Sequence, residues 1–179
     1  MRRSSTRCVI RIPDAVWAPT RQYLLAVPVE RMAYLLGHAS VWTDPWGRTT
    51  TDILVRCAIP VPDNALTLQT SVRVDVDPAL TGTVLRTCYE YALSLIDVHT
   101  HPFADRSVCF SGHDEANMRI THAEFSDAIP ERPPIFPASL VLGRRSVAGI
   151  WRNPSSGSLE NVDELRLLGR SENTLDLTH

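Results

Sequence analysis

Signals for strands and helices alternate through the middle of the chain, and this alternation constrains the fold more than any other feature. Leu95–Val98 is a short, mostly apolar segment typical of a buried strand. Helical segments flank it, from Asp77 to about Leu93 and from Asp114 to about Ala128, and each opens on an aspartate. With strand pairs resembling hairpins at both ends of the chain, this pattern predicts an α/β fold in which helices pack on a mixed β-sheet.

The rest of the chain divides into short elements separated by turn residues. Asp44-Pro45-Trp46-Gly47 predicts a turn between two strands. Further strands are expected over residues 8–12, 32–43, 52–59, 72–76, 139–142, 146–151 and 165–168, and a further helix over residues 14–26. Loops are expected over residues 60–70, 102–112 and 129–137. We expect residues 1–170 to form one domain and residues 171–179 to be a frayed C-terminal tail.

Length and composition exclude several classes of protein. The 179 residues are too few for a (β/α)8 barrel, which needs roughly 250. All 18 basic residues are arginine, and a net charge of -2 argues against binding to nucleic acid. The four cysteines form no CxxC pair, and no stretch of 18 apolar residues is present. The sequence therefore predicts a reduced, cytoplasmic protein without a membrane partner.

Two histidines two residues apart mark the candidate site. His99 and His101, followed by Pro102, stand at the end of the buried strand. In an extended chain, residues i and i+2 point to the same side, so both imidazoles could bind one metal ion. Asp97 is expected to point in the opposite direction and to be a supporting or structural group.

The third metal ligand is expected shortly after the histidines. Asp114 stands at a predicted helix start, where free backbone N–H groups favour a carboxylate even without a metal. His113 is a competing candidate. The barrel of the amidohydrolases, which opens on a similar Asp-x-His-x-His, cannot be built from the residues that remain, and neither HExxH nor the deaminase signature is present.

These residues resemble the pattern of the JAB1/MPN/Mov34 (JAMM) metalloproteases. In that family a glutamate at the head of an apolar strand is followed by a distant HxHP, and then by a serine with an aspartate three residues later. Here Glu30 precedes Arg31–Gly37, His99, His101 and Pro102 match the second motif, and Ser111 and Asp114 match the third. The loop between His101 and Ser111 is about two residues longer than is usual in the family. The resemblance implies a single MPN (JAB) domain with a cytidine-deaminase-like fold.

The resemblance also implies a mechanism. His99, His101 and Asp114 would hold Zn²⁺, and Glu30 would take a proton from the attacking water and pass it to the leaving amine. Ser111 would donate a hydrogen bond to the oxyanion of the tetrahedral intermediate.

The substrate class follows from the same resemblance. JAMM proteases cleave peptide or isopeptide bonds after the C-terminal tail of ubiquitin or a ubiquitin-like protein. The chain is similar to small bacterial members encoded beside E1-like, E2-like and ubiquitin-like proteins, including antiphage conjugation operons. We expect residues 60–70 and 128–137 to form the walls that receive the tail. Two alternatives remain: a metallopeptidase of the same fold acting on a sulfur-carrier protein or a small peptide, and a non-catalytic MPN scaffold.

Overall fold

The histidine-bearing strand lies inside the sheet. The structure is a computed structural model that describes residues 6–129, 134–169, 173–175 and 177. Strand β6 (Ser94–Thr100) runs antiparallel to β2 (Met32–Thr43) and parallel to β7 (Pro137–Leu142). Because both edges of β6 are paired and its apolar residues are buried, the prediction of a buried strand is confirmed.

A mixed sheet continues on both sides of β6. Nine strands of the described residues join in the order β11-β10-β1-β3-β2-β6-β7-β8-β9. The parallel pairs are β6 with β7, β1 with β3, and β1 with β10, and the other neighbours are antiparallel. The remaining strands are β1 (Thr6–Pro13), β3 (Thr49–Pro60), β8 (Val147–Arg152), β9 (Leu159–Asn161), β10 (Glu164–Leu168) and β11 (Asn173–Leu175). The predicted α/β class with a mixed sheet is confirmed.

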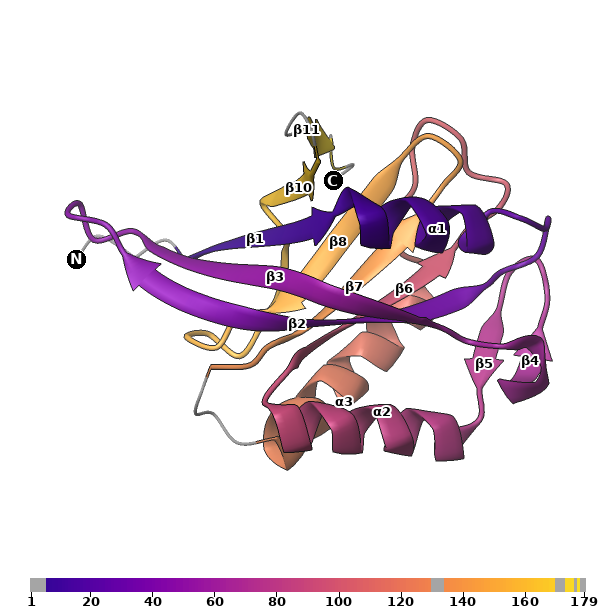
Figure 1. Cartoon of the computed structure of the whole chain (residues 1–179), viewed down its shortest axis with the longest axis horizontal. Helices are drawn as coiled ribbons and strands as arrows, with labels where there is room; N and C mark the ends of the chain where they lie inside the picture. Colours follow the sequence, from indigo (N-terminus) through magenta and orange to yellow (C-terminus); the bar gives the residue numbers. More distant parts are fainter. Residues whose placement is uncertain (1–5, 130–133, 170–172, 176, 178–179) are drawn as a thin grey trace.

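Helices cover both faces of the sheet (Figure 1). Helix α1 (Asp14–Leu24) packs on one face, where Trp17 and Leu24 join a core with residues of β1 and β3. Helices α2 (Pro78–Tyr91) and α3 (Gly112–Ala128) pack on the other. Neighbours in β2 divide between the two cores, since Leu35 faces the α1 side and Tyr34 the side of α2 and α3. The candidate site lies on the side of α2 and α3.

The prediction of a loop over residues 60–70 is wrong, because most of this segment has regular secondary structure. It holds a 3-10 turn, η1 (Asp63–Ala65), and strand β4 (Leu66–Gln69), which pairs antiparallel with β5 (Val74–Val76). The prolines and the Asp-Asn pair that precede Leu66 indicate a loop, while the apolar-polar alternation of Leu-Thr-Leu-Gln is only four residues long. This two-stranded unit lies beside the candidate site.

The predicted strand over residues 32–43 is confirmed as β2, but it is buried over only about half of its length. Ala33–Gly37 are buried, but from His38 onward β2 leaves β6 and continues as an arm paired with β3 alone (Figure 1). The change occurs at an irregularity between Leu36 and Gly37, where a Cβ on Gly37 would lie 2.5 Å from the Leu54 carbonyl oxygen. The arm ends in the predicted turn, in which Asp44 Oδ1 accepts hydrogen bonds from the Trp46 and Arg48 amides.

The C-terminal segment is not wholly a frayed tail. Asn173–Leu175 form β11 beside β10, and Leu177 forms a bridge with Val147. The apolar side chains of Leu175 and Leu177, two residues apart, pack against the main core, which explains the ordering. The rest of residues 171–179, and residues 130–133 of the predicted loop at 129–137, lie outside the described residues. Among the described helices, none is long and apolar enough to cross a membrane.

Candidate metal centre

Pairing on both sides holds the end of β6 where the two histidines stand. The Thr100 amide donates to the Arg31 carbonyl oxygen at 3.1 Å, and the Thr100 hydroxyl accepts from the Arg31 amide at 2.9 Å. On the other side, the His101 amide donates to the Leu142 carbonyl oxygen at 3.0 Å. The rings of His99 and His101 are 5.1 Å apart between centroids. The i, i+2 spacing therefore brings both imidazoles to one place on a fixed backbone.

The first turn of α3 supplies the carboxylate. Ser111 is the N-cap of α3 and Asp114 its third residue, so the helix begins two residues before the predicted start. The two residues form a capping box: the Ser111 hydroxyl accepts from the Asp114 amide at 3.2 Å, and Asp114 Oδ2 accepts from the Ser111 amide at 2.7 Å. The hydroxyl also donates to Oδ2 at 2.7 Å. This turn fixes the direction in which the carboxylate points.

His99, His101 and Asp114 have the separations of metal ligands. Nε2 of His101 lies 3.4 Å from Oδ2 of Asp114, and Nε2 of His99 lies 3.7 Å from Oδ1. One ligand atom from each residue lies within 4.8 Å of the other two. Tetrahedral ligand atoms about 2.0–2.1 Å from a zinc ion lie about 3.4 Å apart, which is close to these distances.

An unpartnered nitrogen supports the presence of a metal. His99 is 8% exposed, and its Nε2 is buried without a hydrogen-bond partner. A buried polar atom without a partner lowers the stability of the folded protein by about 1–3 kcal/mol unless a hydrogen bond or a metal ion compensates it. A metal ion between His99, His101 and Asp114 would do so, and two imidazoles with one carboxylate suit a divalent metal. The residues present therefore fit a metal, although the donor set alone does not identify zinc.

The charges in this group stabilise one another. Burial raises the pKa of Asp114, but the neighbouring His101, His99 and Ser111 side chains more than offset it, and the pKa lies well below its ordinary value. The contact with Asp114 raises the pKa of His101 above that of a free histidine. Without a metal, the pair His101–Asp114 is thus an ion pair over an extended range of pH.

Glu30 joins the group from the start of β2. It is 3% exposed, and its Oε1 lies 3.7 Å from Nε2 of His101. The Glu30 amide donates to the Thr70 carbonyl oxygen at 2.8 Å, and the Gln69 side chain donates to the Glu30 carbonyl oxygen at 3.0 Å. The unpredicted strand β4 is therefore what holds Glu30. Burial raises the pKa of Glu30, and the nearby imidazoles of His99 and His101 only partly reverse the shift.

The longer loop between His101 and Ser111 is attached to the turn between β7 and β8. The Arg144 amide donates to the Ala104 carbonyl oxygen at 2.9 Å, and the Arg145 amide donates to the Asp105 carbonyl oxygen at 3.0 Å. The side chains of Arg145 and Asp105 form an ion pair. These contacts anchor the extra residues, so a longer loop is compatible with the close approach of Asp114 to the histidines.

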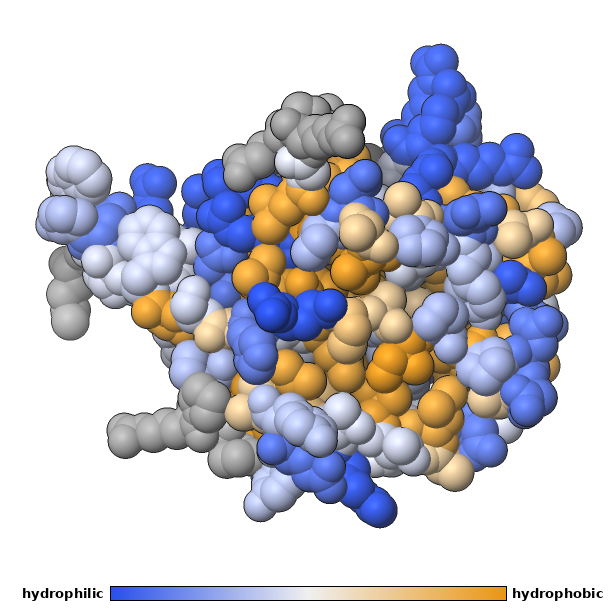
Figure 2. Space-filling model, in the orientation of Figure 1, coloured by the Kyte–Doolittle hydropathy of each residue, from blue (hydrophilic) through white to orange (hydrophobic). Residues whose placement is uncertain are grey.

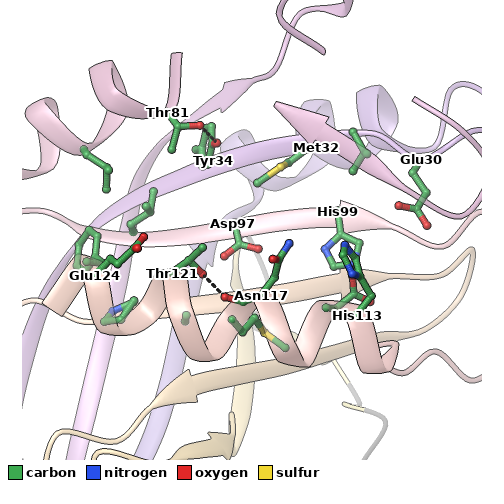
Figure 3. A pocket seen from close by; sticks show the side chains of 18 of the residues that line it. Glu30, Met32, Tyr34, Thr81, Asp97, His99, His113, Asn117, Thr121 and Glu124 are labelled. Atoms are coloured by element: carbon green, nitrogen blue, oxygen red, sulfur yellow. Dashed lines mark hydrogen bonds and ion pairs between the residues drawn. The ribbon is translucent and has the colours of Figure 1, made fainter. Parts of the chain in front are cut away.

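A pocket of about 310 Å³ extends from the metal centre along β6. Its walls are α3 on one side and α2 with the segment Val72–Val74 on the other, and the strands β2 and β6 form its floor (Figure 3). His113, a competing ligand candidate, lines this pocket and is not part of the ligand group. Figure 2 shows hydrophobic side chains gathered on the exposed face of the molecule between the sheet and α2. The centre thus opens into an elongated groove.

Asp97 lines the same pocket as His99, so the expectation that it points in the opposite direction is wrong. Two residues apart on one strand, the side chains share a face. Asp97 Oδ1 accepts from the Ser139 hydroxyl at 2.6 Å, and Nε2 of His122 lies 2.8 Å from the same hydroxyl. Reasoning from the sequence missed this network, because it joins β6, β7 and α3 and no local spacing links its members.

Comparison with known proteins does not identify the chain. No protein-family model matches it, and no curated protein sequence matches it significantly.

Proposed function

We propose that the chain is a zinc-dependent peptidase or isopeptidase with a JAMM-type site on an MPN (JAB) domain of cytidine-deaminase-like fold. The observation that carries the proposal is that a buried glutamate converges with the three potential ligands, with 3.7 Å between Glu30 Oε1 and His101 Nε2. Glu30 approaches the same Nε2 atom of His101 that lies 3.4 Å from Asp114, so its carboxylate faces the place where the metal would be held. A hydrolase needs such a carboxylate to move protons.

The roles of the residues follow from their positions. Zinc held by His99, His101 and Asp114 would supply a Lewis acid that polarises a carbonyl group and acidifies water. Glu30 takes a proton from the attacking water and delivers it to the leaving amine.

Ser111 has a second task beyond capping α3. In the structure its hydroxyl proton points to Asp114 Oδ2. Rotation of the hydroxyl toward the groove would let it donate to the oxyanion that forms when water attacks the carbonyl. Asp114 would keep the hydrogen bond from the Ser111 amide, so the ligand would remain oriented during this change.

The groove suits an extended peptide, and we assign it to the C-terminal tail of a ubiquitin-like protein. One predicted wall, residues 60–70, contains β4, whose partner β5 borders the groove through Val74. No strand among the described residues pairs with the other edge of β5, so an added strand could pair there. Of the second predicted wall, residues 128–137, Ala128 and Pro137 line the pocket.

The substrate would be the precursor of the modifier or its conjugates, and the chain would act in the cytoplasm. E1-like and E2-like proteins of the same operon are proposed as further partners, as in an antiphage conjugation system. The groove would equally admit the tail of a sulfur-carrier protein. A scaffold without activity is less well supported, because the potential ligands and Glu30 are all present together.

Cleavage by the zinc-loaded full chain tests this proposal. Ubiquitin-like proteins fused to a reporter after their C-terminal tails are the substrates, and mass spectrometry locates the cut. Glu30→Gln should bind zinc and lose cleavage, while the matched change Glu115→Gln, at an exposed glutamate beside Asp114, should keep both. If Glu30→Gln cleaves as well as the wild type, or if no fusion is cut by zinc-loaded protein, the proposed function is wrong.

A further inference from the structure

A second cavity lies at the end of α3 that is remote from the metal centre. Its volume is about 450 Å³, and it borders the groove, since Phe125 and Pro137 line both. Its walls are the last turn of α3, the segment that leads into β7, and the turn between β8 and β9. This volume lies within the range of small-molecule sites. The cavity is therefore large enough for an organic ligand.

The lining of this cavity is mostly apolar. Apolar side chains come from α3 and from the segment before β7: Phe125, Ile129, Pro134, Ile135 and Phe136. Only Ser126 and Arg152 bring polar side chains to the lining, and the Ser126 hydroxyl already donates to the His122 carbonyl oxygen at 2.8 Å. An apolar lining with one free cationic group suits a ligand that has an apolar body and one anionic group.

Arg152 has no anionic partner within the protein. It is the half-buried last residue of β8, and its guanidinium makes no ion pair or hydrogen bond in the part of the chain that the structure describes. The other half-buried arginines of that part each pair with a carboxylate: Arg7, Arg11, Arg31 and Arg166. The acidic residue of the β8–β9 hairpin, Glu160, instead accepts from Asn153, Ser156 and Ser158. The charge of Arg152 is therefore available to a ligand.

The guanidinium lies on the face of the sheet that α3 covers. Ile150 of β8 lies opposite Ser139 of β7, whose hydroxyl contacts His122 of α3. Arg152 follows Ile150 by two residues, so its side chain leaves the strand on the same side. At the β8–β9 turn, a Cβ on Gly157 would lie 3.7 Å from an Nη atom of Arg152. The guanidinium is thus placed at the wall of the cavity, beside this turn.

We propose that this cavity binds a small organic acid, with its carboxylate on Arg152 and its apolar body against Phe125, Ile129 and Phe136. A guanidinium presents parallel N–H donors that match the two oxygens of a carboxylate. A monoanion is favoured over a phosphate dianion, because a single arginine lines the cavity and the negative C-terminal end of α3 lies beside it. The proposal depends neither on the metal centre nor on the proposed function.

NMR titration of the zinc-loaded, ¹⁵N-labelled full chain with acids and their neutral amides tests this proposal. The probes are 3-phenylpropanoate with 3-phenylpropanamide, which have an aromatic body, and octanoate with octanamide, which have an aliphatic one. At least one acid should bind roughly ten times more tightly than its amide, as expected for hydrogen bonds to a charged group. The backbone amide signals of Ser126 and Gly157 should shift on binding, which locates the ligand without any substitution.

Three variants assign the preference for the acid to Arg152. Arg152→Gln should reduce the ratio of the two Kd values to about one and leave binding of the amide unchanged. Arg73→Gln, which removes the arginine of the neighbouring groove, should keep the tenfold preference. Ser126 is exposed on α3, so Ser126→Trp can place a ring at the cavity wall, and it should weaken binding of acid and amide alike.

The same measurements distinguish this cavity from the metal centre. An acid bound to the metal would be released by EDTA and would shift the signals of His99 and Asp114, whereas binding at Arg152 should be the same with and without zinc. The proposal is wrong if neither acid is preferred over its amide at millimolar concentration, or if Arg152→Gln keeps the preference. Loss of the preference with EDTA or in Arg73→Gln would also overturn it.

Discussion

Replacement of His99 by phenylalanine separates a metal ligand from an ordinary buried histidine. His99 is 8% exposed, its Nε2 has no hydrogen-bond partner, and its ring contacts Phe110 at 5.9 Å between centroids. His99→Phe keeps an aromatic ring there and removes the unpartnered nitrogen. In the metal-free protein, relief of about 1–3 kcal/mol from that nitrogen should offset a similar cost of fitting the larger ring. The free energy of unfolding should change by no more than about 1 kcal/mol.

The same change should abolish the response to zinc. A ligand at 100 times its Kd stabilises the folded protein by about 2.7 kcal/mol, which corresponds to a rise in Tm of roughly 5–10 °C for a chain of this size. We expect this rise in the wild type and none in His99→Phe. Thermal and urea unfolding, each with EDTA and with added zinc, measure both quantities.

His122→Phe is the matched control for the zinc response, because His122 is a buried histidine outside the ligand group. Its Nε2 lies 2.8 Å from the Ser139 hydroxyl, and it is 2% exposed. His122→Phe removes that hydrogen bond but also an Nδ1 that has no partner, so its effect on the metal-free protein does not separate the two histidines; the zinc response should be kept. Stabilisation of His99→Phe by zinc, or loss of the zinc response in His122→Phe, would contradict the assignment of His99 as a metal ligand.

Three further predictions concern the cap, the sheet and the dependence on pH. Ser111→Ala should lower stability by about 1 kcal/mol through loss of the helix cap, which unfolding curves measure. The variant should still bind zinc, but its kcat for cleavage should fall by roughly 100- to 1000-fold. Gly37→Ala should destabilise the fold by about 3 kcal/mol or more in urea unfolding, because its Cβ would lie 2.5 Å from a backbone oxygen of Leu54 that the paired strand cannot move aside. In the metal-free protein, the raised pKa of His101 contributes stability at low pH, and this stability is lost as the pH rises through the folded-state pKa, above about 6.5. The lowered pKa of Asp114 contributes stability above about pH 3.9, and this stability is lost on acidification. Urea midpoints should therefore be highest between these limits, and a midpoint that still rises above pH 8 would contradict this assignment.

Local spacing explains why much of the candidate site could be predicted. The i, i+2 relation of His99 and His101 needs only an extended strand, and the capping box of Ser111 and Asp114 needs only a helix start. Proximity of these two pairs depends on the packing of α3 on the sheet. Glu30 was predicted through a resemblance alone, and it reaches the site because β2 pairs with β6 in a register that places Met32 opposite His99.

Long-range contacts account for what could not be predicted. Strand β4 is short and follows turn residues, so its apolar-polar alternation is a weak signal, yet its last residues hold Glu30. Ser139 and His122 reach Asp97 from a different strand and from a helix. No pattern of residues along the chain indicates that these three side chains are in contact. The outer half of β2 has an apolar sequence but extends beyond β6, where nothing in the described chain covers it.

The amount of zinc bound per chain decides whether His99, His101 and Asp114 form a metal centre. Elemental analysis of the purified full chain, with His101→Ala and Asp114→Ala beside the wild type, needs no knowledge of the substrate. We predict about one zinc per folded wild-type chain and none in either variant, with all three folded by circular dichroism. A folded wild type that takes up no zinc after reconstitution, or variants that retain it, would contradict the claim that these residues form a metal centre.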